Sequence, residues 1–352
     1  MERNKILFLL KRREDYSVEK HSAMGLSTGL YNSAFFMHEM LINAGVESKL
    51  SVVVDNNSID KEVTEYRPTH VIIEALWVVP TKFFVLCKLH PTVKWIIRLH
   101  SEVPFLAGEG MAFDWISDYS NFSNITIAAN GPRALKEVRL FLGIRNNWDN
   151  NILENKIIYL PNFYPQKYKT KKFNRDKGHI DISCFGAVRP LKNHILQVLG
   201  ALKFAKKTDK KLKFHVNAGR IEMQGGPVLS NLKDMFIQLH DAGHELINHE
   251  WTPREEFLKL CSKMDIGMQV SFSETFNIVG ADHIIEGVPL VGSVEIPWIN
   301  KETCADVTET DDIYKKLLLA YEFPELNVEL NRNNLDIYTT NTRKIWLDYF
   351  KK

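Results

Sequence analysis

The chain has 352 residues, of which 45% are apolar and 25% are charged, and 45 Lys and Arg against 43 Asp and Glu leave a formal net charge of +2. This composition is that of a globular protein and excludes a disordered chain, a collagen and a coiled coil. The nearly even charge balance argues against nucleic acid as a partner. At about 150 residues per domain, the length favours two domains, and the alternative is one large α/β domain.

The N-terminal apolar run, residues 6–10, is predicted to be a buried strand rather than a signal peptide. It is short, and charged residues 11–15 stand where a small-residue cleavage site would be. The most apolar longer stretch, residues 70–87, is interrupted by two charged residues and a proline, so no membrane-spanning helix is predicted. Four widely spaced cysteines fit reduced thiols. We expect a cytoplasmic protein without a transmembrane segment, for which peripheral contact with a membrane stays open.

Short apolar runs alternate with segments of helical period along the first half of the chain, the pattern of βαβ units. The expected strands are residues 5–10, 51–54, 70–75, 93–99, 124–129 and 157–160. Most are apolar throughout, which is typical of parallel strands buried on both faces. A helix is expected over residues 32–44, capped by Asn32 or Ser33 and ended by Gly45.

The second half repeats this alternation. Strands are expected over residues 180–185, 212–217, 245–247, 264–270 and 289–292, and helices over residues 193–206, 227–240 and 253–263. Each half therefore has enough strands for its own doubly wound sheet.

A basic segment, residues 163–179, joins the halves and carries a single acid, Asp176. Its composition fits a solvated surface linker, and the alternative is a basic clamp for an anionic acceptor or a membrane surface. Near the C-terminus, apolar residues at helical spacing over residues 341–352 predict a helix that packs back across the first domain.

The most informative stretch, residues 271–291, follows a buried strand and opens a helix near residues 277–281. A helix N-terminus then lies at the carboxyl end of a parallel strand. There the backbone N–H groups of Phe276, Asn277 and Ile278 would face a bound diphosphate, because helix N-termini attract anions.

Two carboxylates, Glu274 and Asp282, flank this expected phosphate site. A carboxylate beside a phosphate should turn toward neutral hydroxyl donors, such as those of a sugar or a ribose. The alternative is that Glu274 only caps the helix and that Asp282 is an exposed helical residue.

A second loop follows the first strand of the second half and holds Gly186, Arg189 and Lys192. Gly186 permits a tight turn, and the two cations could neutralise a diphosphate, Arg189 through two parallel hydrogen bonds and Lys192 as a point charge. The alternative is a pair of exposed basic residues in a surface loop.

In the first half, Gly25, Ser27 and Gly29 precede the expected helix, so their amides could face an opening between the domains. His100 follows a buried strand, where open sheets place functional side chains, although a structural role is equally open. The two histidines of residues 244–249 are one residue too far apart for a zinc-protease motif, and we predict no metal site.

Residues 274–282, E-T-F-N-I-V-G-A-D, are similar to the E-x-F-G-x-x-x-x-E signature of retaining glycosyltransferases of the GT-B type, in the family 4 group related to glycogen synthase and bacterial glycan-building enzymes. Residues 287–291, G-V-P-L-V, follow this stretch at the position expected from the same family pattern. Residues 186–193, His100 and residues 161–162 support the resemblance, which covers nearly the whole chain in order.

The resemblance implies an α/β GT-B fold with two Rossmann-like, doubly wound parallel-sheet domains facing across a cleft. The N-terminal, acceptor-side domain would span residues 1–165 with a C-terminal helix at about 335–352, and the nucleotide-sugar domain residues 175–330. The donor would be a nucleotide diphosphate sugar, with no other cofactor and no metal.

Residue by residue, the resemblance implies that Glu274 contacts donor-sugar hydroxyls, Asp282 binds the ribose, Lys192 holds the diphosphate and His100 lies near the reacting sugar. Three positions depart from the family pattern: Ala187 where Arg is usual, Asn277 for Gly and Asp282 for Glu. The implied function is sugar transfer to a glycan, lipid-linked or small-molecule acceptor with retention of anomeric configuration. The alternatives are a sugar-nucleotide epimerase and a non-catalytic glycan- or nucleotide-binding module.

Overall fold

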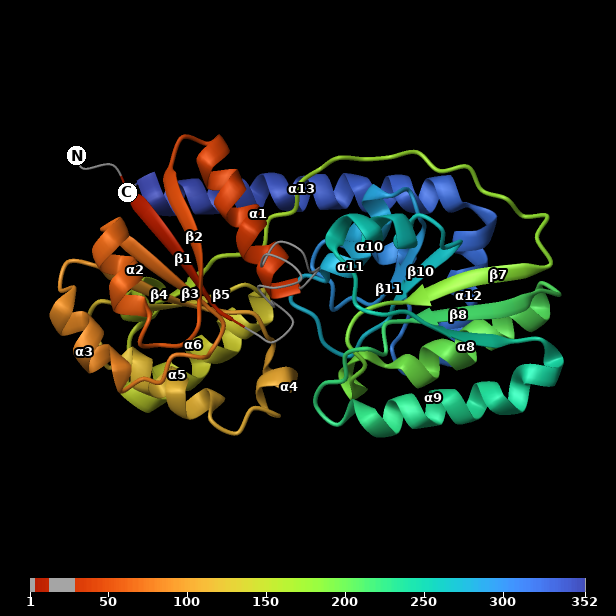
Figure 1. Cartoon of the computed structure of the whole chain (residues 1–352), viewed down its shortest axis with the longest axis horizontal. Helices are drawn as coiled ribbons and strands as arrows, with labels where there is room; N and C mark the ends of the chain where they lie inside the picture. Colours follow the sequence, from red (N-terminus) through yellow and green to blue (C-terminus); the bar gives the residue numbers. More distant parts are fainter. Residues whose placement is uncertain (1–3, 13–28, 352) are drawn as a thin grey trace. The chain divides into compact units, whose positions relative to one another are not determined.

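The computed structural model describes residues 4–12 and 29–351. The chain divides into two compact units, the first made of Met1–Pro165 and Thr339–Lys352 and the second of Gln166–Tyr338. Figure 1 shows the elements of each unit along the chain. Each unit contains an open sheet of parallel strands with helices on both faces.

The sheet of the first unit has the strand order β2-β1-β3-β4-β5-β6, and all its strands are parallel. The strands are β1 (Lys5–Lys11), β2 (Glu47–Val53), β3 (His70–Glu74), β4 (Lys94–Leu99), β5 (Ile125–Ala129) and β6 (Ile157–Tyr159). The order reverses between β1 and β3, as in flavodoxin-like sheets. Ligands of such sheets bind at this switch point, outside the carboxyl ends of the strands.

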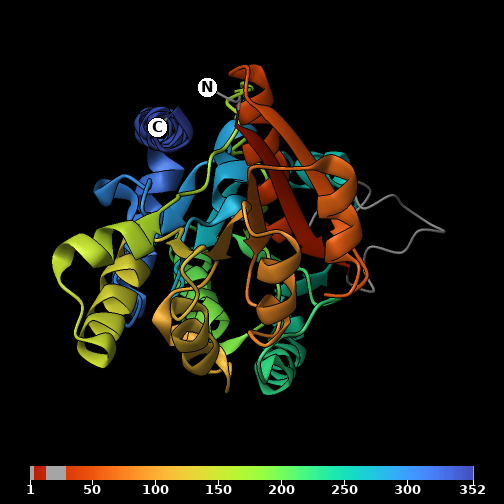
Figure 2. The same ribbon diagram turned by 90° about the vertical axis from the view of Figure 1, so that its left-hand side faces the viewer.

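Alternation along the strands divides the first core into two layers. Leu7 and Leu9 of β1 pack with one set of helices, and Ile6 and Phe8 pack on the opposite face. The first layer is covered by α2 (Ile59–Tyr66), α3 (Lys82–Leu89), α5 (Ala112–Ser120) and α6 (Pro132–Asn146), and the second by α1 (Gly29–Asn43) and the end of α13 (Pro324–Lys351). Figure 2 shows this unit end on. The short helices α4 (Val103–Leu106) and α7 (Asn150–Lys156) complete the described part of the unit.

The sheet of the second unit has the order β11-β10-β7-β8-β9. Its strands are β7 (His179–Cys184), β8 (Lys211–Val216), β9 (Glu245–Asn248), β10 (Ile266–Gln269) and β11 (Leu290–Gly292), all paired in parallel. Numbered from 1 to 5 within the unit and read from β9, this is the Rossmann order 3-2-1-4-5, and the switch point lies between β7 and β10.

The larger layer of the second core is covered by α8 (His194–Lys207), α9 (Gly225–Leu239) and α12 (Thr310–Glu322). The smaller layer, around Phe185 and Phe257, is covered by α10 (Arg254–Cys261) and α11 (Ile278–Ile285). Short 3₁₀ turns lie at Pro190–Lys192, His240–Ala242 and Lys301–Thr303. Because helices cover both faces of the sheets, most strands consist largely of apolar residues, as the sequence indicated.

The first helix begins earlier than its sequence pattern predicted. It starts at Gly29, so Asn32 and Ser33 lie buried inside it and neither caps it. The Ser33 hydroxyl instead donates to Asn162 Oδ1 at 2.6 Å. The prediction of a cap at these two residues was therefore wrong, because a polar residue that suits a helix end was recruited for a tertiary hydrogen bond.

The basic segment that joins the sheets is held by the second unit and is not simply a solvated linker. The Lys169 N–H donates to the Ile285 carbonyl at 2.7 Å, and the Lys169 ammonium lies 2.7 Å from Glu286 Oε1. Lys171 donates to the Ser262 carbonyl at 2.8 Å and to the Met264 carbonyl. Burial lowers the pKa of Lys171 to about 8. These cations satisfy backbone and carboxylate oxygens of their own unit.

The C-terminal helix α13 contributes to both units and is longer than the sequence pattern indicated. Its last turns cover the first sheet, where Trp346 is fully buried and its indole N–H donates to the Pro161 carbonyl at 2.9 Å. The Trp346 ring also stacks on Phe8 at 6.0 Å. Trp346 therefore anchors the end of α13 on the sheet of the first unit.

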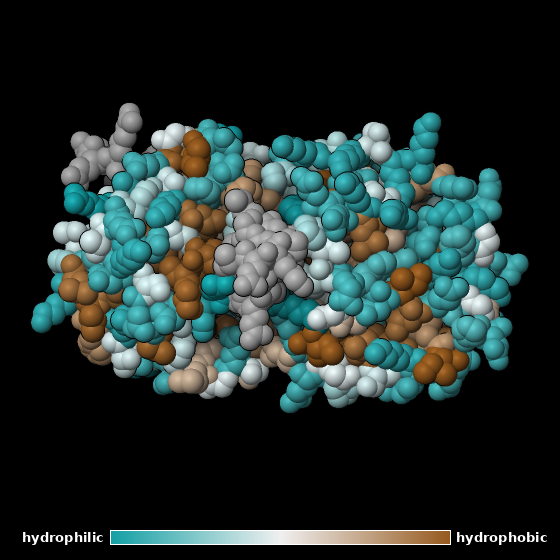
Figure 3. Space-filling model, in the orientation of Figure 1, coloured by the Kyte–Doolittle hydropathy of each residue, from teal (hydrophilic) through white to brown (hydrophobic). Residues whose placement is uncertain are grey.

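The surface is mostly hydrophilic on the face drawn in Figure 3, with apolar side chains gathered over α3 and α9. The exposed apolar residues of α3 are Phe84, Val85 and Leu89, and α9 exposes Ile237. Within residues 4–12 and 29–351, no helix is both long enough and apolar enough to cross a membrane.

Candidate functional site

The second unit gathers most of the predicted site residues at its switch point. The loop after β7 carries Gly186, Arg189 and Lys192, and the loop after β10 carries Glu274 and Asn277. Because β7 and β10 are paired parallel neighbours, the loops that leave their carboxyl ends are adjacent.

Gly186 allows the first loop to turn tightly over Lys192. Its φ is +113°, and a β-carbon at this position would lie 3.7 Å from Lys192 Cε. The Gly186 N–H donates to Asn217 Oδ1 at 3.2 Å. At the other end of the loop, Asn193 donates to the Val270 and Val307 carbonyls at 3.1 and 2.7 Å. Lys192 is therefore positioned by a loop fixed at both ends.

Lys192 and Glu274 form a buried ion pair. The Lys192 ammonium donates to Glu274 Oε1 at 2.5 Å, and the side chains are 9% and 7% exposed. Burial by itself raises the pKa of the Glu274 carboxyl, but the charges of Lys192 and Arg189 outweigh it and leave that pKa below its usual value. Glu274 is thus an ionised hydrogen-bond acceptor at neutral pH, as its predicted contact with hydroxyl groups requires.

Asn277 begins helix α11 in the left-handed backbone region, with φ of 64°. Its side-chain oxygen accepts from the Gly280 N–H at 2.7 Å, and its amide nitrogen donates to Gln269 Oε1 at 2.8 Å. This conformation costs a glycine least, which explains why a glycine suits this position. Asn277 tolerates the conformation better than most residues and adds a helix cap.

The backbone at the start of α11 is partly engaged by the protein. The Phe276 side chain is buried, and its carbonyl accepts from the Trp298 indole N–H at 2.6 Å. The N–H groups of Asn277 and Ile278 donate to no protein acceptor within the described part of the chain. Backbone N–H groups of this kind at a helix N-terminus attract anions.

Gln269, which the sequence analysis missed, joins the two loops. Its side-chain oxygen accepts from Asn277 at 2.8 Å and lies 3.4 Å from the Lys192 ammonium, and its amide donates to the Phe185 carbonyl at 3.0 Å. A polar residue inside the apolar strand β10 was the signal that could have indicated it, because buried polar side chains need partners.

Asp282 is buried, at 1% exposure, so it is not an exposed helical residue. One oxygen accepts from Arg254 Nη2 at 2.9 Å. Arg189 pairs in a similar way with Glu222, at 3.1 Å. Asp282, expected at the ribose, and Arg189, expected at the diphosphate, therefore both have partners within the protein. The sequence pattern did not indicate these pairs.

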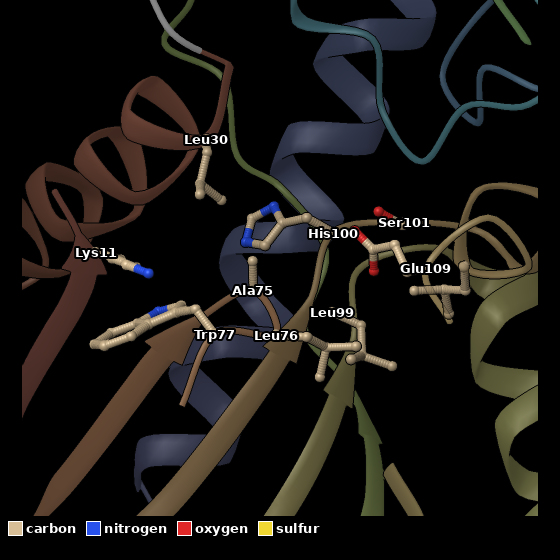
Figure 4. Close-up of a pocket in the computed structure, with 10 residues that line it drawn as sticks. Lys11, Leu30, Ala75, Leu76, Trp77, Leu99, His100, Ser101 and Glu109 are labelled. Carbon is tan, nitrogen blue, oxygen red and sulfur yellow. The ribbon is translucent and has the colours of Figure 1, made fainter. Parts of the chain in front are cut away.

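His100 lies in the first unit at the ends of β3 and β4 (Figure 4), in a network of buried polar groups. Its Nε2 is hydrogen-bonded to Glu74, and its Nδ1 lies 3.3 Å from Asn130 Nδ2. Arg98 is fully buried and donates to Glu74 at 3.1 Å, to the Leu160 carbonyl at 3.0 Å and to Asn162.

Burial keeps His100 neutral at neutral pH. Burial lowers the pKa of His100 although the Glu74 charge opposes it, while the Arg98 charge and the hydrogen bond from His100 hold the pKa of Glu74 down against its own burial. An amide that donates to Nδ1 leaves the ring proton on Nε2, where it is donated to Glu74. His100 is thus oriented by its neighbours, and the charged residues inside apolar strands were the sequence signal for this network.

The remaining predicted residues are the glycine-rich group before α1. Gly25 and Ser27 lie outside the described residues, and Gly29 is the first residue of α1, with open space around it.

No protein-family model and no curated protein matches this sequence. Solved structures do match. Sucrose-phosphate synthase from Thermosynechococcus elongatus aligns over 99% of this chain and 98% of its own, with 12% identity and a TM-score of 0.67. HepE from Anabaena, in complex with UDP-glucose, aligns over 99% and 100% with 11% identity and a TM-score of 0.66. The chain has the GT-B fold.

An α,α-trehalose-phosphate synthase from Burkholderia vietnamiensis shares the GT-B fold as well, over 99% of this chain and 96% of its own, with 8% identity and a TM-score of 0.67. At such low identities the likeness concerns the backbone fold, and the function has to be argued from the site.

Proposed function

We propose that this chain is a glycosyltransferase that moves a sugar from a nucleotide diphosphate sugar to a glycan, lipid-linked or small-molecule acceptor. The observation that carries the proposal is the buried Lys192–Glu274 pair at the β7/β10 switch point, beside the capped N-terminus of α11. Together these groups provide a cation, an ionised carboxylate that accepts hydrogen bonds, and backbone N–H groups without a protein partner in the described part of the chain.

The transfer breaks the bond between the anomeric carbon and the diphosphate, and the electron pair leaves with the diphosphate. The acceptor hydroxyl oxygen forms the new bond to that carbon, and its proton leaves with the diphosphate. Lys192 and the N–H groups of Asn277 and Ile278 stabilise the charge that develops on the leaving group. The Glu274 carboxylate accepts hydrogen bonds from donor-sugar hydroxyls and orients the ring.

The proposed transfer retains the anomeric configuration and does not require a metal ion. Lys192 provides at the diphosphate the positive charge that a metal ion would otherwise supply. Product NMR should show a retained configuration, and addition of a chelator should leave turnover unchanged. A product of inverted configuration would refute retention, and loss of turnover with the chelator would refute independence from metal.

A non-catalytic binding module is the second candidate. Three departures from the family pattern favour it: Ala187 for Arg, Asn277 for Gly and Asp282 for Glu. A module would bind nucleotide sugars without turning them over.

A thermal-shift screen against UDP-, GDP-, ADP- and CDP-sugars tests donor binding. A ligand at 100 times its dissociation constant adds about 2.7 kcal/mol of stability. With the responding donor, Lys192→Ala and Glu274→Ala should each lower turnover at least ~10²-fold, since each removes one charge-stabilising group. Binding without any donor hydrolysis or transfer supports the module, and unchanged turnover in both variants contradicts the proposed site.

A further inference from the structure

Strand β9 forms an open edge of the second sheet. It pairs with β8 at the end of the strand order, and the His249 N–H just after it donates to the Val216 carbonyl at 2.8 Å. Alternate residues of a strand direct their backbone groups to opposite sides, so the N–H and C=O groups of Leu246 and Asn248 face away from β8. Neither N–H donates to an acceptor within residues 4–12 and 29–351. These two residues therefore offer backbone hydrogen bonds to another strand.

A groove of about 740 Å³ lies between this edge and α9. Leu246 and Asn248 line it from the strand, and Phe236 and Ile237 line it from the helix. Ile237 is 72% exposed and belongs to the apolar side chains over α9 in Figure 3. The edge thus has apolar surface beside its unpaired backbone groups, as surfaces covered by a partner commonly do.

The sequence of this edge, residues 244–250, H-E-L-I-N-H-E, is complementary in charge to a second copy of itself that runs antiparallel. When the pairing is centred on Ile247, the opposed residues are Glu245 with His249, His244 with Glu250, and Leu246 with Asn248. The outward backbone groups of the two strands then pair with each other. Centring the pairing on Leu246 or on Asn248 places no acid opposite a histidine. Charge therefore selects the register centred on Ile247.

The His244 imidazole is set to donate a hydrogen bond in this arrangement. Its Nδ1 accepts from the Leu212 N–H at 2.9 Å, so the proton of the neutral ring is on Nε2. His244 also lines the groove, and Glu250 is exposed. The carboxylate of Glu250 from a second copy provides the acceptor that this N–H needs.

The helix side of the groove has the same symmetry. Lys233 and Asp241 both line it and lie four residues before and four residues after Ile237. A twofold axis perpendicular to the sheet places two copies of α9 side by side and antiparallel on one face. Lys233 of each copy then faces Asp241 of the other, so the helices are complementary in charge as the strands are.

We propose that β9 and α9 form the interface of a homodimer, in which two copies of β9 pair antiparallel around a twofold axis at Ile247. Each copy contributes the same residues, so the interface closes after two copies and covers both open edges. The dimer is independent of the proposed function, since β9 lies two strands from β7 and its pairing uses neither donor loop.

Sedimentation equilibrium of the full chain over a dilution series tests the stoichiometry. Twice the mass of one chain is expected at high concentration, with dissociation to single chains on dilution or a stable dimer throughout. A single chain at every concentration, or growth into larger assemblies, overturns the inference, because an isologous interface closes at two copies.

Substitutions in α9 test the contact between the helices. Lys233→Asp and Asp241→Lys should each weaken the dimer at least ~10-fold, because each sets like charges against each other at two symmetry-related places. The double variant Lys233→Asp/Asp241→Lys restores opposite charges and should recover most of the affinity. Lys315→Asp makes the same charge change at an exposed position of α12, which packs on the opposite edge strand β11, and should have no effect. Unchanged dimers in both single variants, or a double variant weaker than either, contradict the contact.

Cysteine cross-linking tests the register in a Cys87→Ser background, because the other three cysteines are buried. Oxidation of Ile247→Cys should give a disulfide-linked dimer, since the two copies of this residue lie directly opposite each other. Glu245→Cys should not cross-link, because its two copies would lie about 13 Å apart along the strands, beyond the ~7 Å reach of a disulfide between Cα atoms. Any result other than cross-linking of Ile247→Cys alone refutes the axis at Ile247. Nucleotide-sugar binding of these variants reports separately on the donor site and should be unchanged.

Discussion

Lys192 and Glu274 depend on each other inside the protein. Both are nearly buried, and each is the other's main counter-charge at 2.5 Å. Removing one member of such a pair leaves a buried charge without compensation, whereas removing both can be close to neutral. The pair therefore links stability to the proposed donor site, and the two effects can be separated by substitution.

We expect Lys192→Met to lower the free energy of unfolding by about 3–5 kcal/mol. It should also raise the pKa of Glu274, because burial then acts without the Lys192 charge. The double variant Lys192→Met/Glu274→Gln should recover most of that stability without recovering turnover. Urea denaturation measures the free energy of unfolding of the single and the double variant. Lys203→Ala is the matched control, because its pair with Asp311 is exposed and should contribute less than ~1 kcal/mol.

Three buried histidines make stability depend on pH. Burial lowers the pKa of His70 and His283 to about 4 and that of His194 to about 3. A lowered pKa in the folded state means that the unfolded chain binds protons first as the pH falls. The contribution of these three neutral imidazoles to the free energy of unfolding is complete above about pH 6.5 and is lost as the pH falls toward 4.

Denaturation at successive pH values should show the free energy of unfolding falling below pH 6.5, with a slope approaching about 4 kcal/mol per pH unit for three protons. His283→Gln should reduce that slope by about one third. The imidazole of His283 lies 2.7 Å from both the Ser183 hydroxyl and the Val279 carbonyl, which the neutral ring can satisfy. Constant stability between pH 6.5 and 4.5 would contradict this account.

At the scale of elements, the start of α9 fixes the loop that carries Arg189 and Lys192. A β-carbon on Gly225 would lie 2.0 Å from the Val188 carbonyl oxygen, whereas one on Gly226 would meet nothing within 4 Å. These neighbouring glycines therefore provide a matched pair of substitutions in one helical turn.

Gly225→Ala should destabilise the protein by at least about 1–3 kcal/mol, because backbone must move to admit the methyl group. It should also weaken donor binding, since the displaced loop carries Lys192. Gly226→Ala should be neutral or stabilise by up to about 1 kcal/mol through its higher helix propensity. Thermal denaturation and nucleotide-sugar titration of both variants check this, and equal effects would argue against the close approach.

Most strands were predictable because parallel strands buried on both faces leave continuous apolar runs. β3, β4 and β5 lie within one residue of their predicted limits at either end. Helix ends were harder, because the residues that suit caps also make tertiary hydrogen bonds, as Ser33 does with Asn162. Helix α13 was predicted only in its last turns, since its earlier part lacks a simple apolar period.

At the scale of the whole molecule, α13 is the element that belongs to both units. Its residue Trp346 fills the core of the first unit, where its ring also lies 5.1 Å from the Arg98 guanidinium. The first unit is thus completed by the end of the chain, although its sheet is encoded by the first 165 residues.

Trp346→Ala should lower the stability of the first unit by about 3–5 kcal/mol through the cavity it leaves. Hydrogen exchange should quicken in β1, β3 and β6 and stay unchanged in β7 and β8. Ile337→Ala, in the same helix at 63% exposure, should change stability by less than about 0.5 kcal/mol. Equal quickening in both sheets would show that the units unfold together.

The sequence by itself determined the two parallel sheets and the loops that carry Gly186, Lys192, Glu274 and Asn277, because apolar period and strand-end position are local properties. Only the tertiary structure decided the partners: Lys192 with Glu274, Asp282 with Arg254, and His100 with Glu74. These partners are far apart in sequence, and the switch points that gather them arise from the order in which strands join a sheet. That order is set by packing across the whole unit, so a single loop does not encode it.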